Sequence, residues 1–459
     1  MITAPPLYYS TNRLAPESTF SEALLRGLAP DGGLYMPLTI PGLKESEISE
    51  FSGMGYAEIA ARVLGAFLEG DIPADDLLQM TTDAYNFDVP LEKCSKTLHI
   101  MRLDRGPTAS FKDFAARMMA RMMQYYTRNK GRRLVVLVAT SGDTGSAIAS
   151  AFHGLPGIEV VILFPKGEVT DNQRRQMTTL GKNVSVMSVN GKFDDCQRMV
   201  KQAFSDIDLS QKGLTSANSI NIGRLLPQSV YYFYAYSRLE LHGGSPVSFA
   251  VPSGNFGNMM GGMIAKRMGL PVHRFIIATN MNDEFPEYLG SGVYHPVEPS
   301  RNCISNAMNV GHPSNLARLI ALYGGRMDEK GNIISQPDLN AMRRDIFSFP
   351  VTDESSMETV NRYFADKGIT VEPHGATALA AIDEYGRVYK GAEDQRVPIV
   401  ALETAHPAKF PEPVAMATGK SPTVPDSLKG LDGKEEHYEL IDNNYEVLKE
   451  YLLSLPDFQ

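Results

Sequence analysis

The most regular pattern of apolar and polar positions in this chain lies in the segment GPTASFKDFAARMMARMMQYY, residues 106–126. Apolar side chains recur there at intervals of three and four residues, with arginine and glutamine on the opposite face, which predicts an amphipathic helix. Ser110 stands three residues before Asp113, the spacing of a capping box, so the helix is predicted to begin at Ser110. The predicted buried face consists of Phe114, Ala115, Met118, Met119, Met122, Met123 and Tyr126.

Lys112 falls in the first turn of this predicted helix. Its amine there meets the positive end of the helix dipole, and partial burial disfavours the ammonium form further. Both effects lower the pKa of the amine, which it needs in order to act as a nucleophile or to form a Schiff base. A lysine whose stem lies along a core helix and whose amine reaches water is the commoner arrangement, so this segment alone leaves both interpretations open.

Strand-like and helix-like patterns alternate on both sides of this segment, which predicts an α/β fold. Apolar runs of strand length, typical of strands buried on both faces, occupy residues 132–140 and 160–164, and residues 183–191 also predict a strand. The segment GLAPDGGLYMP, residues 27–37, predicts a connector rich in turns. Helices are predicted at residues 20–28, 56–69, 193–204 and 445–453.

Two segments share one plan: VVLVATSGDTGSAIASAFHGLP at residues 135–156 and VSFAVPSGNFGNMMGGMIAKRMGLP at residues 247–271. Each predicts a strand, a turn of the form Ser-Gly-(Asp/Asn)-x-Gly-(Ser/Asn), and a helix that ends in Gly-Leu-Pro. The glycines allow backbone amides to converge, and the helix N-terminus adds positive charge, so each turn is a candidate anion site. A single turn of this kind is ordinary in a parallel sheet. Two turns built to one plan, in a chain that also carries Lys112, are more specific.

Composition narrows the class of protein. A length of 459 residues suggests about three domain-sized units, and the hydrophobic share of 43% is ordinary for a globular chain. The net charge is −9 without any basic cluster, so neither nucleic acid nor an anionic membrane is an expected partner. Cys94, Cys196 and Cys303 form neither a zinc nor a disulfide pattern. The chain shows no secretory signal pattern and no apolar run of about 18 residues, so a cytoplasmic protein is expected.

Other binding motifs do not match the two turns. The chain contains no GxxxxGK[ST] loop, no GxGxxG turn with an acidic residue about 20 positions later, and no GxSxG elbow. The nine histidines form no HExxH motif and no cluster with cysteine, so no metal site is predicted. His374 and His406 stand in segments rich in glycine and proline, and each is a candidate either for structural hydrogen bonds or for a place in a pocket.

An activated amine beside two anion sites suits a cofactor that carries both an aldehyde and a phosphate. Pyridoxal phosphate fits, with Lys112 for the aldehyde, one turn for the phosphate and the other turn for the carboxylate of an amino acid. A series of motifs also resembles the threonine synthase family, in the family's order from about residue 8 to residue 410. The motifs are GLAPDGGLYMP, GPTASFKDF, ATSGDTGSA, SANSINIGRLLPQ, PSGNFGN, AMNVGHPSN, EPHGATA and ETAHPAKF.

The resemblance implies the α/β fold shared by the tryptophan synthase β subunit and the serine and threonine dehydratases. In that fold two open α/β subdomains hold the cofactor between them, here with an additional mixed α/β domain in front. We accordingly expect an N-terminal domain at residues 1–98, a catalytic core at residues 99–420 and a tail with a docking helix at residues 421–459. A smaller subdomain is expected within the core at about residues 134–215. A monomer or a homodimer is expected.

The resemblance also implies roles for individual residues. Lys112 would form the Schiff base with the cofactor and act as acid and base. The cofactor would further be bound by Asp143, Gly254, Asn255, Phe256, Gly257, Asn258 and Thr404. The substrate would be bound by Ser141, Thr144, Asn218, Ser219 and Arg224.

Within these sets the expected partners differ. Residues 254–258 would bind the cofactor phosphate, and Ser141 and Thr144 the substrate carboxylate. Thr404 would face the pyridine nitrogen, where a hydroxyl does not favour the protonated ring as a carboxylate would. Arg224, with Asn218 and Ser219, would bind the phosphate of the substrate, because guanidinium groups bind phosphate in a bidentate manner.

The chain departs from the family pattern at two positions. Asp143 stands where many relatives of this fold have asparagine beside the 3′ oxygen of the cofactor. An ionised aspartate would repel a phenolate there, so a shared proton is expected. Asn12 stands where some relatives have arginine, which removes any role carried over for that position.

The function that the resemblance implies is conversion of O-phospho-L-homoserine and water to L-threonine and phosphate. Two alternatives stay open from the sequence: a dehydratase or β-replacement enzyme of the same fold, and a non-catalytic relative that binds ligands. A dehydratase needs no second phosphate site, so Arg224 and the long leading region count against it. A non-catalytic relative has no need to retain Lys112, both turns and Arg224.

Overall fold

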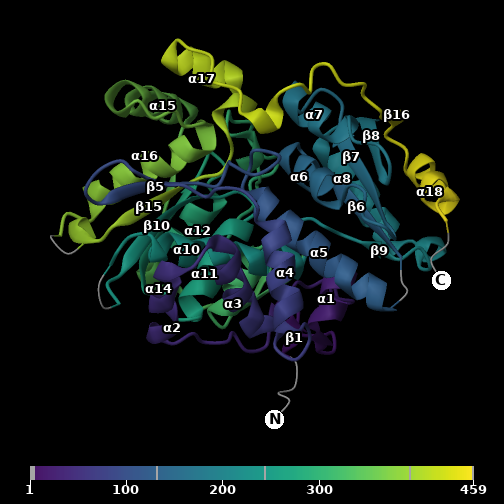
Figure 1. Ribbon diagram of the computed structural model, residues 1–459, viewed down its shortest axis with the longest axis horizontal. Helices are drawn as coiled ribbons and strands as arrows, with labels where there is room; N and C mark the ends of the chain where they lie inside the picture. Colours follow the sequence, from purple (N-terminus) through teal and green to yellow (C-terminus); the bar gives the residue numbers. More distant parts are fainter. Residues whose placement is uncertain (1–5, 131–132, 242–243, 392–393, 457–459) are drawn as a thin grey trace.

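Two open sheets, each flanked by helices, lie next to each other in the computed structural model of this chain (Figure 1). The structure describes residues 6–130, 133–241, 244–391 and 394–456. The arrangement confirms the predicted α/β fold with two subdomains, and the leading part of the chain lies beneath them in the figure. None of the described helices is long and apolar enough to cross a membrane.

The larger subdomain is built on a six-stranded sheet in the order β14-β11-β10-β15-β5-β4, parallel except for β4. Successive residues of one strand face opposite cores, as the period of two requires. On β11, Phe275 and Ile277 pack into the main core, whereas Ile276 and Ala278 pack with α15 (Asp353–Lys367) and α16 (Pro373–Val388). The strands are β4 (Leu91–Lys93), β5 (Leu98–Arg102), β10 (Val247–Pro252), β11 (Val272–Thr279), β14 (Ile346–Pro350) and β15 (Ile399–Glu403).

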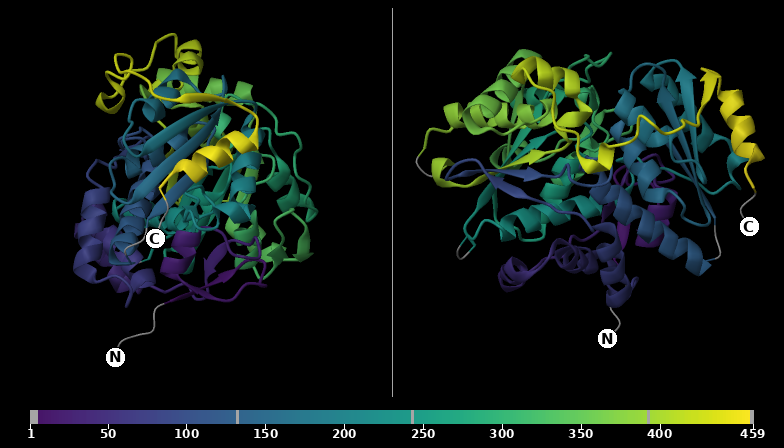
Figure 2. Two further views of the ribbon diagram at one scale, coloured as in Figure 1. Left: turned by 90° about the vertical axis from the view of Figure 1, so that its right-hand side faces the viewer. Right: turned by 45° about the horizontal axis from the view of Figure 1, so that its top comes forward.

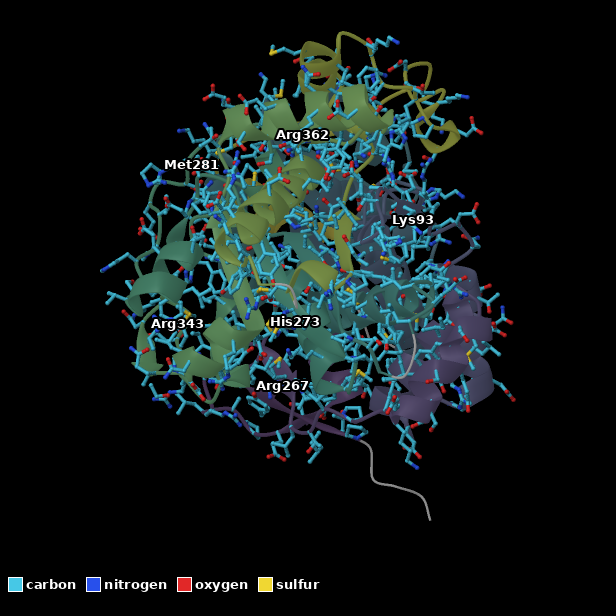
Figure 3. The ribbon with its side chains drawn as sticks, turned by 90° about the vertical axis from the view of Figure 1, so that its left-hand side faces the viewer. Lys93, Arg267, His273, Met281, Arg343 and Arg362 are labelled. Carbon is cyan, nitrogen blue, oxygen red and sulfur yellow. The ribbon has the colours of Figure 1, made fainter. Side chains whose placement is uncertain are left out.

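Helices cover both faces of this sheet, which explains why its central strands are apolar throughout. In Figure 3, His273 near the start of β11 and Met281 just beyond its end mark the direction in which that strand runs. The helices are α9 (Ile222–Leu225), α10 (Val230–Ser237), α11 (Gly257–Arg267), α12 (Glu284–Ser291), α13 (Leu316–Leu322), α14 (Leu339–Asp345), α15 (Asp353–Lys367), α16 (Pro373–Val388) and α17 (Pro411–Thr418). The short strands β12 (Arg326–Met327) and β13 (Ile333–Ser335) form a separate hairpin.

The smaller subdomain is built on a parallel five-stranded sheet in the order β16-β8-β7-β6-β9. The apolar runs predicted as strands are confirmed as β6 (Leu134–Ala139), β7 (Ile158–Pro165) and β8 (Val184–Asn190). The other strands are β9 (Leu214–Thr215) and β16 (Glu439–Asp442), and the helices are α6 (Asp143–Phe152), α7 (Asp171–Thr178), α8 (Phe193–Ser205) and α18 (Tyr445–Ser454).

The leading part of the chain packs against the main core through its helices. The helices predicted at residues 20–28 and 56–69 are confirmed as α1 and α3, and the turn-rich connector between residues 27 and 37 ends in β3. The elements are β1 (Leu7–Ser10), β2 (Ser18–Thr19), α1 (Phe20–Arg26), β3 (Tyr35–Pro37), α2 (Glu45–Glu50), α3 (Tyr56–Leu68) and α4 (Ala74–Ala84).

The tail runs from the larger subdomain to the smaller one, as both views of Figure 2 show. Its helix α18 is the one predicted from the sequence, but β16 was not predicted, and it pairs with the edge strand β8. Glu436 accepts hydrogen bonds from Arg174 on α7 at 2.9 and 3.1 Å, and Lys449 lies 2.9 Å from Asp206. The tail is therefore part of the smaller subdomain's sheet as well as an external helix.

Candidate active site

The helix that carries Lys112 is α5 (Lys112–Lys130), and its apolar face is buried as predicted. The predicted capping box is wrong: the helix begins at Lys112, and the Ser110 hydroxyl is buried without a hydrogen-bond partner among the described residues. The Asp113 carboxylate instead accepts hydrogen bonds from the backbone and the hydroxyl of Thr108, at 2.8 and 2.6 Å. It therefore shapes the loop before the helix, where a Cβ at Gly106 would lie 2.4 Å from its oxygen.

The start of α5 is also tied to the end of β15. Ser110 forms a β-bridge with Ala405, and the backbone N–H of Phe111 donates to the carbonyl oxygen of Thr404 at 2.8 Å. These two contacts bring Thr404 next to Lys112, although the residues are far apart in the sequence. The Thr404 side chain is 5% exposed, and its hydroxyl makes no hydrogen bond within the described part of the chain.

Lys112 has the environment of an activated amine. Its Nζ lies 3.7 Å from Oδ2 of Asp143, and its side chain is 15% exposed. Burial lowers the pKa of the Lys112 amine, and the nearby cations Lys409 and Arg224 lower it further against the opposing charge of Asp143. The predicted direction of the shift is confirmed, with two cations as causes that the sequence analysis did not include.

Asp143 is held between two lysines. Its Oδ1 lies 2.7 Å from Nζ of Lys409, which is fully buried, and accepts a hydrogen bond from Gln173 at 2.9 Å. Although burial alone would raise the pKa of Asp143, the charges of Lys409 and Lys112 hold it well below its usual range. The carboxylate is therefore ionised. The expected proton shared with the cofactor stays a prediction.

The first turn, residues 141–146, leads from β6 into α6. Gly142 has φ 134°, and a Cβ there would lie 2.4 Å from the Gln173 side chain, so only glycine fits. Within the described part of the chain, the hydroxyls of Ser141 and Thr144 make no hydrogen bond, and both side chains are partly exposed. They remain available to an anion at the N-terminus of α6.

The second turn, residues 253–258, leads from β10 into α11. Phe256 has φ 61°, a left-handed conformation that is uncommon for any residue other than glycine and turns the backbone sharply before the helix. A Cβ at Gly254 would lie 2.9 Å from the carbonyl oxygen of Ala307. In the described part of the chain, the backbone N–H groups of residues 254–257 have no hydrogen-bond acceptor. Four unpaired donors at a helix N-terminus form an anion site.

Asn258 supplies a further donor to this turn. Its Oδ1 accepts hydrogen bonds from the hydroxyls of Tyr231 and Tyr232, at 2.6 and 2.8 Å. These bonds assign the oxygen and leave Nδ2 buried without a partner among the described residues. A buried amide with an unused donor indicates a ligand at this position.

Asn255 is held from the segment that precedes α13. Its Oδ1 accepts hydrogen bonds from the backbone and the hydroxyl of Ser314, at 3.3 and 3.2 Å, and its carbonyl oxygen accepts one from Nδ2 of Asn315 at 2.8 Å. The Ser314 hydroxyl lies 3.3 Å from that of Ser219. The second turn and the predicted substrate segment at residues 218–219 therefore share one hydrogen-bond network.

Arg224 is a buried cation that forms no ion pair with a carboxylate in the described part of the chain. The residue is 3% exposed and donates from Nη1 to the carbonyl oxygen of Ala217 at 2.8 Å, while Nε has no partner among the described residues. Burial lowers the pKa of Arg224 to about 10. Oδ1 of Asn218 is likewise buried and unpaired. An uncompensated guanidinium beside unused polar atoms is the arrangement expected of a site for an anionic ligand.

Arg318 is a second buried cation without a carboxylate partner among the described residues. Its donors reach the carbonyl oxygens of Tyr35, Ser219 and Ile220 at 3.1, 3.2 and 2.7 Å, and Oδ1 of Asn315 at 2.6 Å. Burial lowers its pKa to about 9. Arg318 therefore joins the leading part of the chain to the backbone of the predicted substrate segment.

The histidines predicted as candidates have structural hydrogen bonds. His374 donates from Nδ1 to Glu372 at 2.5 Å, and its Nε2 accepts the backbone N–H of Ala307 at 3.1 Å. It thereby holds the segment that lies against Gly254. His406 accepts the backbone N–H of Ala408 at 3.1 Å, which forms the turn η6 (Pro407–Lys409).

The residues of this structure fit pyridoxal phosphate. The unpaired donors of residues 254–257 and the unused Nδ2 of Asn258 suit its phosphate, the Lys112 amine suits its aldehyde, and Thr404 provides a free hydroxyl near that amine. The assignments to residues 254–258 and to Thr404 rest on polar groups that have no other partner in the described part of the chain.

Comparisons with known proteins agree with this geometry. Residues 86–403 match the family model described as pyridoxal-phosphate dependent enzyme, residues 7–85 match threonine synthase N terminus, and residues 376–452 match threonine synthase, C-terminal. The chain belongs to the threonine synthase family. A threonine synthase of Haemophilus influenzae is 39% identical over 97% of this chain and 99% of its own length.

Solved structures of this family have the same fold. The pyridoxal-phosphate-bound threonine synthase from Brucella melitensis superposes with a TM-score of 0.90 at 37% identity, covering 97% of this chain and 98% of that one. The threonine synthase from yeast gives 0.88 at 30% identity, covering 98% of each. Pyridoxal phosphate is accordingly the cofactor of this threonine synthase family member, a lyase of the tryptophan synthase β-like fold.

Several residues that complete the site were not predicted from the sequence. Lys409 and Ser314 stand in motifs that carry the family resemblance, so their motifs marked them, although no spacing pointed to their partners. Tyr231, Tyr232 and Gln173 had no such signal, because they act through contacts between distant segments.

Proposed function

We propose that this chain converts O-phospho-L-homoserine and water to L-threonine and inorganic phosphate, the last step of threonine biosynthesis. The observation that carries the choice of substrate is Arg224, a buried guanidinium with an unpaired Nε and no carboxylate partner among the described residues. The second turn already serves the cofactor phosphate, and the first turn suits a carboxylate. A substrate with a carboxylate at one end and a phosphate at the other needs a third anion site, which Arg224 supplies with Asn218 and Ser219.

The binding roles follow from the free donors. Ser141 and Thr144 at the N-terminus of α6 hold the α-carboxylate of the substrate, while residues 254–258 hold the cofactor phosphate through backbone amides and Nδ2 of Asn258. Thr404 would face the pyridine nitrogen and would not favour the protonated ring, because a hydroxyl does not stabilise a pyridinium as a carboxylate does. Arg224 orients the substrate phosphate as a leaving group.

The Lys112 amine moves the protons. When bound, pyridoxal phosphate supplies an electron sink that stabilises negative charge developed at the substrate Cα. Lys112 Nζ, with its lowered pKa, accepts the proton from Cα, releases it again, and as a neutral amine then accepts a proton from Cβ. Phosphate leaves from Cγ with the C–O electron pair, Arg224 stabilises the charge that it carries, water adds at Cβ, and protons return to Cα and Cγ. The sum is one water consumed and one phosphate released.

The experiment that tests this function compares a phosphorylated with an unphosphorylated substrate. A charge-assisted hydrogen bond contributes about 1.5–3 kcal/mol, so Arg224→Leu is expected to lower kcat/KM for phosphohomoserine by roughly ten- to a hundredfold or more. Slow deamination of serine, which carries no phosphate, should be nearly unchanged. Arg224→Lys, which keeps the charge without the planar fork, should lose less than the leucine variant.

Equal losses on both substrates would mean that Arg224 supports the fold. In that case the site would need no second phosphate, and a dehydratase would describe it better. A wild-type enzyme that releases ammonia from serine but no phosphate from phosphohomoserine would contradict the proposed function directly. Whether the enzyme is a monomer or a homodimer, and its cytoplasmic location, stay predictions.

A further inference from the structure

Three charged side chains lie in a row at the site. Asp143 is 3.7 Å from the Lys112 amine through Oδ2 and 2.7 Å from the Lys409 amine through Oδ1. The Lys409 side chain has no exposed surface, and that of Asp143 is 3% exposed. One carboxylate thus lies beside two amines, of which only Lys112 has a role in the proposed reaction.

The position of Lys409 is built by several contacts. Its Nζ donates to the carbonyl oxygen of Thr108 at 2.9 Å, which fixes the amine against the loop before α5. The same carbonyl oxygen accepts a hydrogen bond from Nε2 of Gln176 at 3.2 Å. His406 caps the turn that carries Lys409 by accepting a hydrogen bond from the backbone N–H of Ala408. Burying an ammonium group is costly unless its partners are well placed, and a neutral side chain would avoid that cost. The presence of a buried ammonium group despite this cost indicates that its charge has a function.

The use follows from the geometry around Asp143. A carboxylate that faced Lys112 alone would stabilise the ammonium form of that amine and hold its proton. Lys409 is the nearer of the two lysines to Asp143. Its positive charge therefore offsets much of the effect that the negative charge of Asp143 has on Lys112. Arg224 and Glu372 are the other charged groups that act on Lys112, and they oppose each other.

We propose that Lys409 is a positioning residue of the reaction: it anchors Asp143 and shares its charge, so that the Lys112 amine releases and regains protons readily. Lys409 touches neither the reacting atoms nor the substrate in this role, since it acts through Asp143. The inference rests on the proposed role of Lys112. It is tested without turnover, so its failure can be distinguished from failure of the proposed function.

The experiment follows the protonation of the Schiff base that Lys112 forms with the cofactor, through the visible absorbance of the holoenzyme as a function of pH. Removing one positive charge that acts on Lys112 should favour its protonated form. Lys409→Gln is therefore expected to raise the midpoint of the titration by about 1–3 pH units. Lys409→Arg, which keeps a charge beside Asp143, should restore most of the wild-type midpoint.

A matched control separates charge from hydrogen bonding. Gln173 donates to the same oxygen of Asp143 at 2.9 Å but carries no charge, so Gln173→Met should leave the midpoint within a few tenths of a unit. An unchanged or lowered midpoint in Lys409→Gln would overturn the proposal, and so would a shift of equal size in Gln173→Met.

A second variant keeps the test open if Lys409→Gln does not fold. Asp143→Asn removes the negative charge and leaves Lys409 and Arg224 acting on Lys112, so the midpoint should move in the opposite direction, downward. A midpoint in Asp143→Asn that stays at the wild-type value or rises would show that this charged row does not control Lys112, and the proposal would fall.

Discussion

The two glycine-rich turns of the site, residues 141–146 and 253–258, share one sequence pattern but differ in the charge that they carry. Both begin with Ser-Gly and both open a helix, but the third position is Asp143 in the first turn and Asn255 in the second. Asp143 is bound by the amines of Lys112 and Lys409, whereas Asn255 is bound by the hydroxyl and backbone of Ser314. The first turn therefore carries a buried negative charge, and the second carries none.

The sixth position differs in the same way. Ser146 of the first turn donates back to the carbonyl oxygen of Gly142, at 3.2 Å, so its hydroxyl is used within the protein. Asn258 of the second turn has its oxygen bound by Tyr231 and Tyr232 and its Nδ2 left free. A phosphate dianion needs donors and no nearby carboxylate, whereas the carboxylate of the first turn acts on the pKa of the neighbouring Lys112 amine. One backbone plan thus serves two purposes, and the neighbours of the third and sixth positions decide which.

The largest expected effect separates the chemistry beside the first turn from the binding at the second. Lys112→Ala removes the proton-transferring amine, and turnover of phosphohomoserine should fall by at least about a thousandfold. Cofactor binding should persist in part, because residues 254–258 keep their donors. Borohydride reduction of wild-type holoenzyme followed by peptide mapping should place the pyridoxyl group on Lys112. A label on another lysine would contradict the assignment.

The next effect concerns the buried charge of the first turn. Asp143→Asn leaves Lys409 without an anionic partner, which is expected to cost about 3–5 kcal/mol in the free energy of unfolding near neutral pH. Asn255→Ala, at the matching position of the second turn, breaks neutral hydrogen bonds and should cost about 1–2 kcal/mol. Denaturant unfolding of both variants measures the difference, and equal losses would contradict the comparison.

The stability difference between wild type and Asp143→Asn should depend on pH. The pKa of Asp143 is lowered in the folded enzyme, so its stabilising effect is fully present above its unfolded pKa of about 3.9 and is lost as the pH falls below that value. The stability gap between wild type and Asp143→Asn should therefore narrow below about pH 4. A gap that stays constant down to acid unfolding would mean that folding does not lower the pKa of Asp143.

Much of this comparison could be predicted from the sequence, because its elements are local. The apolar runs and the glycine-rich turns identify β6 with α6 and β10 with α11, and Lys112 stands in a recognisable helix. The start of α5 could not be predicted, since the Asp113 carboxylate accepts hydrogen bonds from Thr108 and none from Ser110. Ser110 and Asp113 have the spacing of a capping box, but the backbone and hydroxyl of Thr108 in the preceding loop donate to the Asp113 carboxylate instead.

The partners that distinguish the turns could not be predicted, because they come from distant segments. Lys409 reaches Asp143 from the turn after β15, and Tyr232 reaches Asn258 from α10. Strand β16 has the same cause: residues 439–442 are short and mostly exposed, so only the edge of β8 makes them a strand. Local patterns determine the helices and strands, whereas contacts between distant segments determine which polar and charged groups meet at the site.

A smaller effect tests the neutrality of the second turn. Asn258→Asp replaces the free donor with a carboxylate and gives the second turn the charge of the first. Repulsion of the cofactor phosphate and loss of one hydrogen bond should weaken cofactor binding by roughly ten- to a hundredfold. Titration of apoenzyme with pyridoxal phosphate measures the dissociation constant. Asn258→Ala, which only removes the donor, should lose less than the aspartate variant, and the reverse order would show that charge is not the deciding factor.

The smallest expected effect concerns the two tyrosines that orient Asn258. Each hydroxyl donates to Oδ1, so Tyr231→Phe or Tyr232→Phe removes one of two bonds that hold the amide with Nδ2 toward the ligand. Each single variant should weaken cofactor binding only a few-fold, because one remaining bond still orients the side chain and a neutral hydrogen bond contributes about 0.5–1.5 kcal/mol. The double variant should lose more binding free energy than the sum of the two single variants, because Asn258 can then rotate.

Tyr85→Phe is the matched control, since the Tyr85 hydroxyl is also buried but has no hydrogen-bond partner among the described residues. If Tyr85→Phe weakened cofactor binding as much as either tyrosine of the pair, the loss would reflect packing of the aromatic core, and the orientation of Asn258 would not be what tunes the second turn for phosphate.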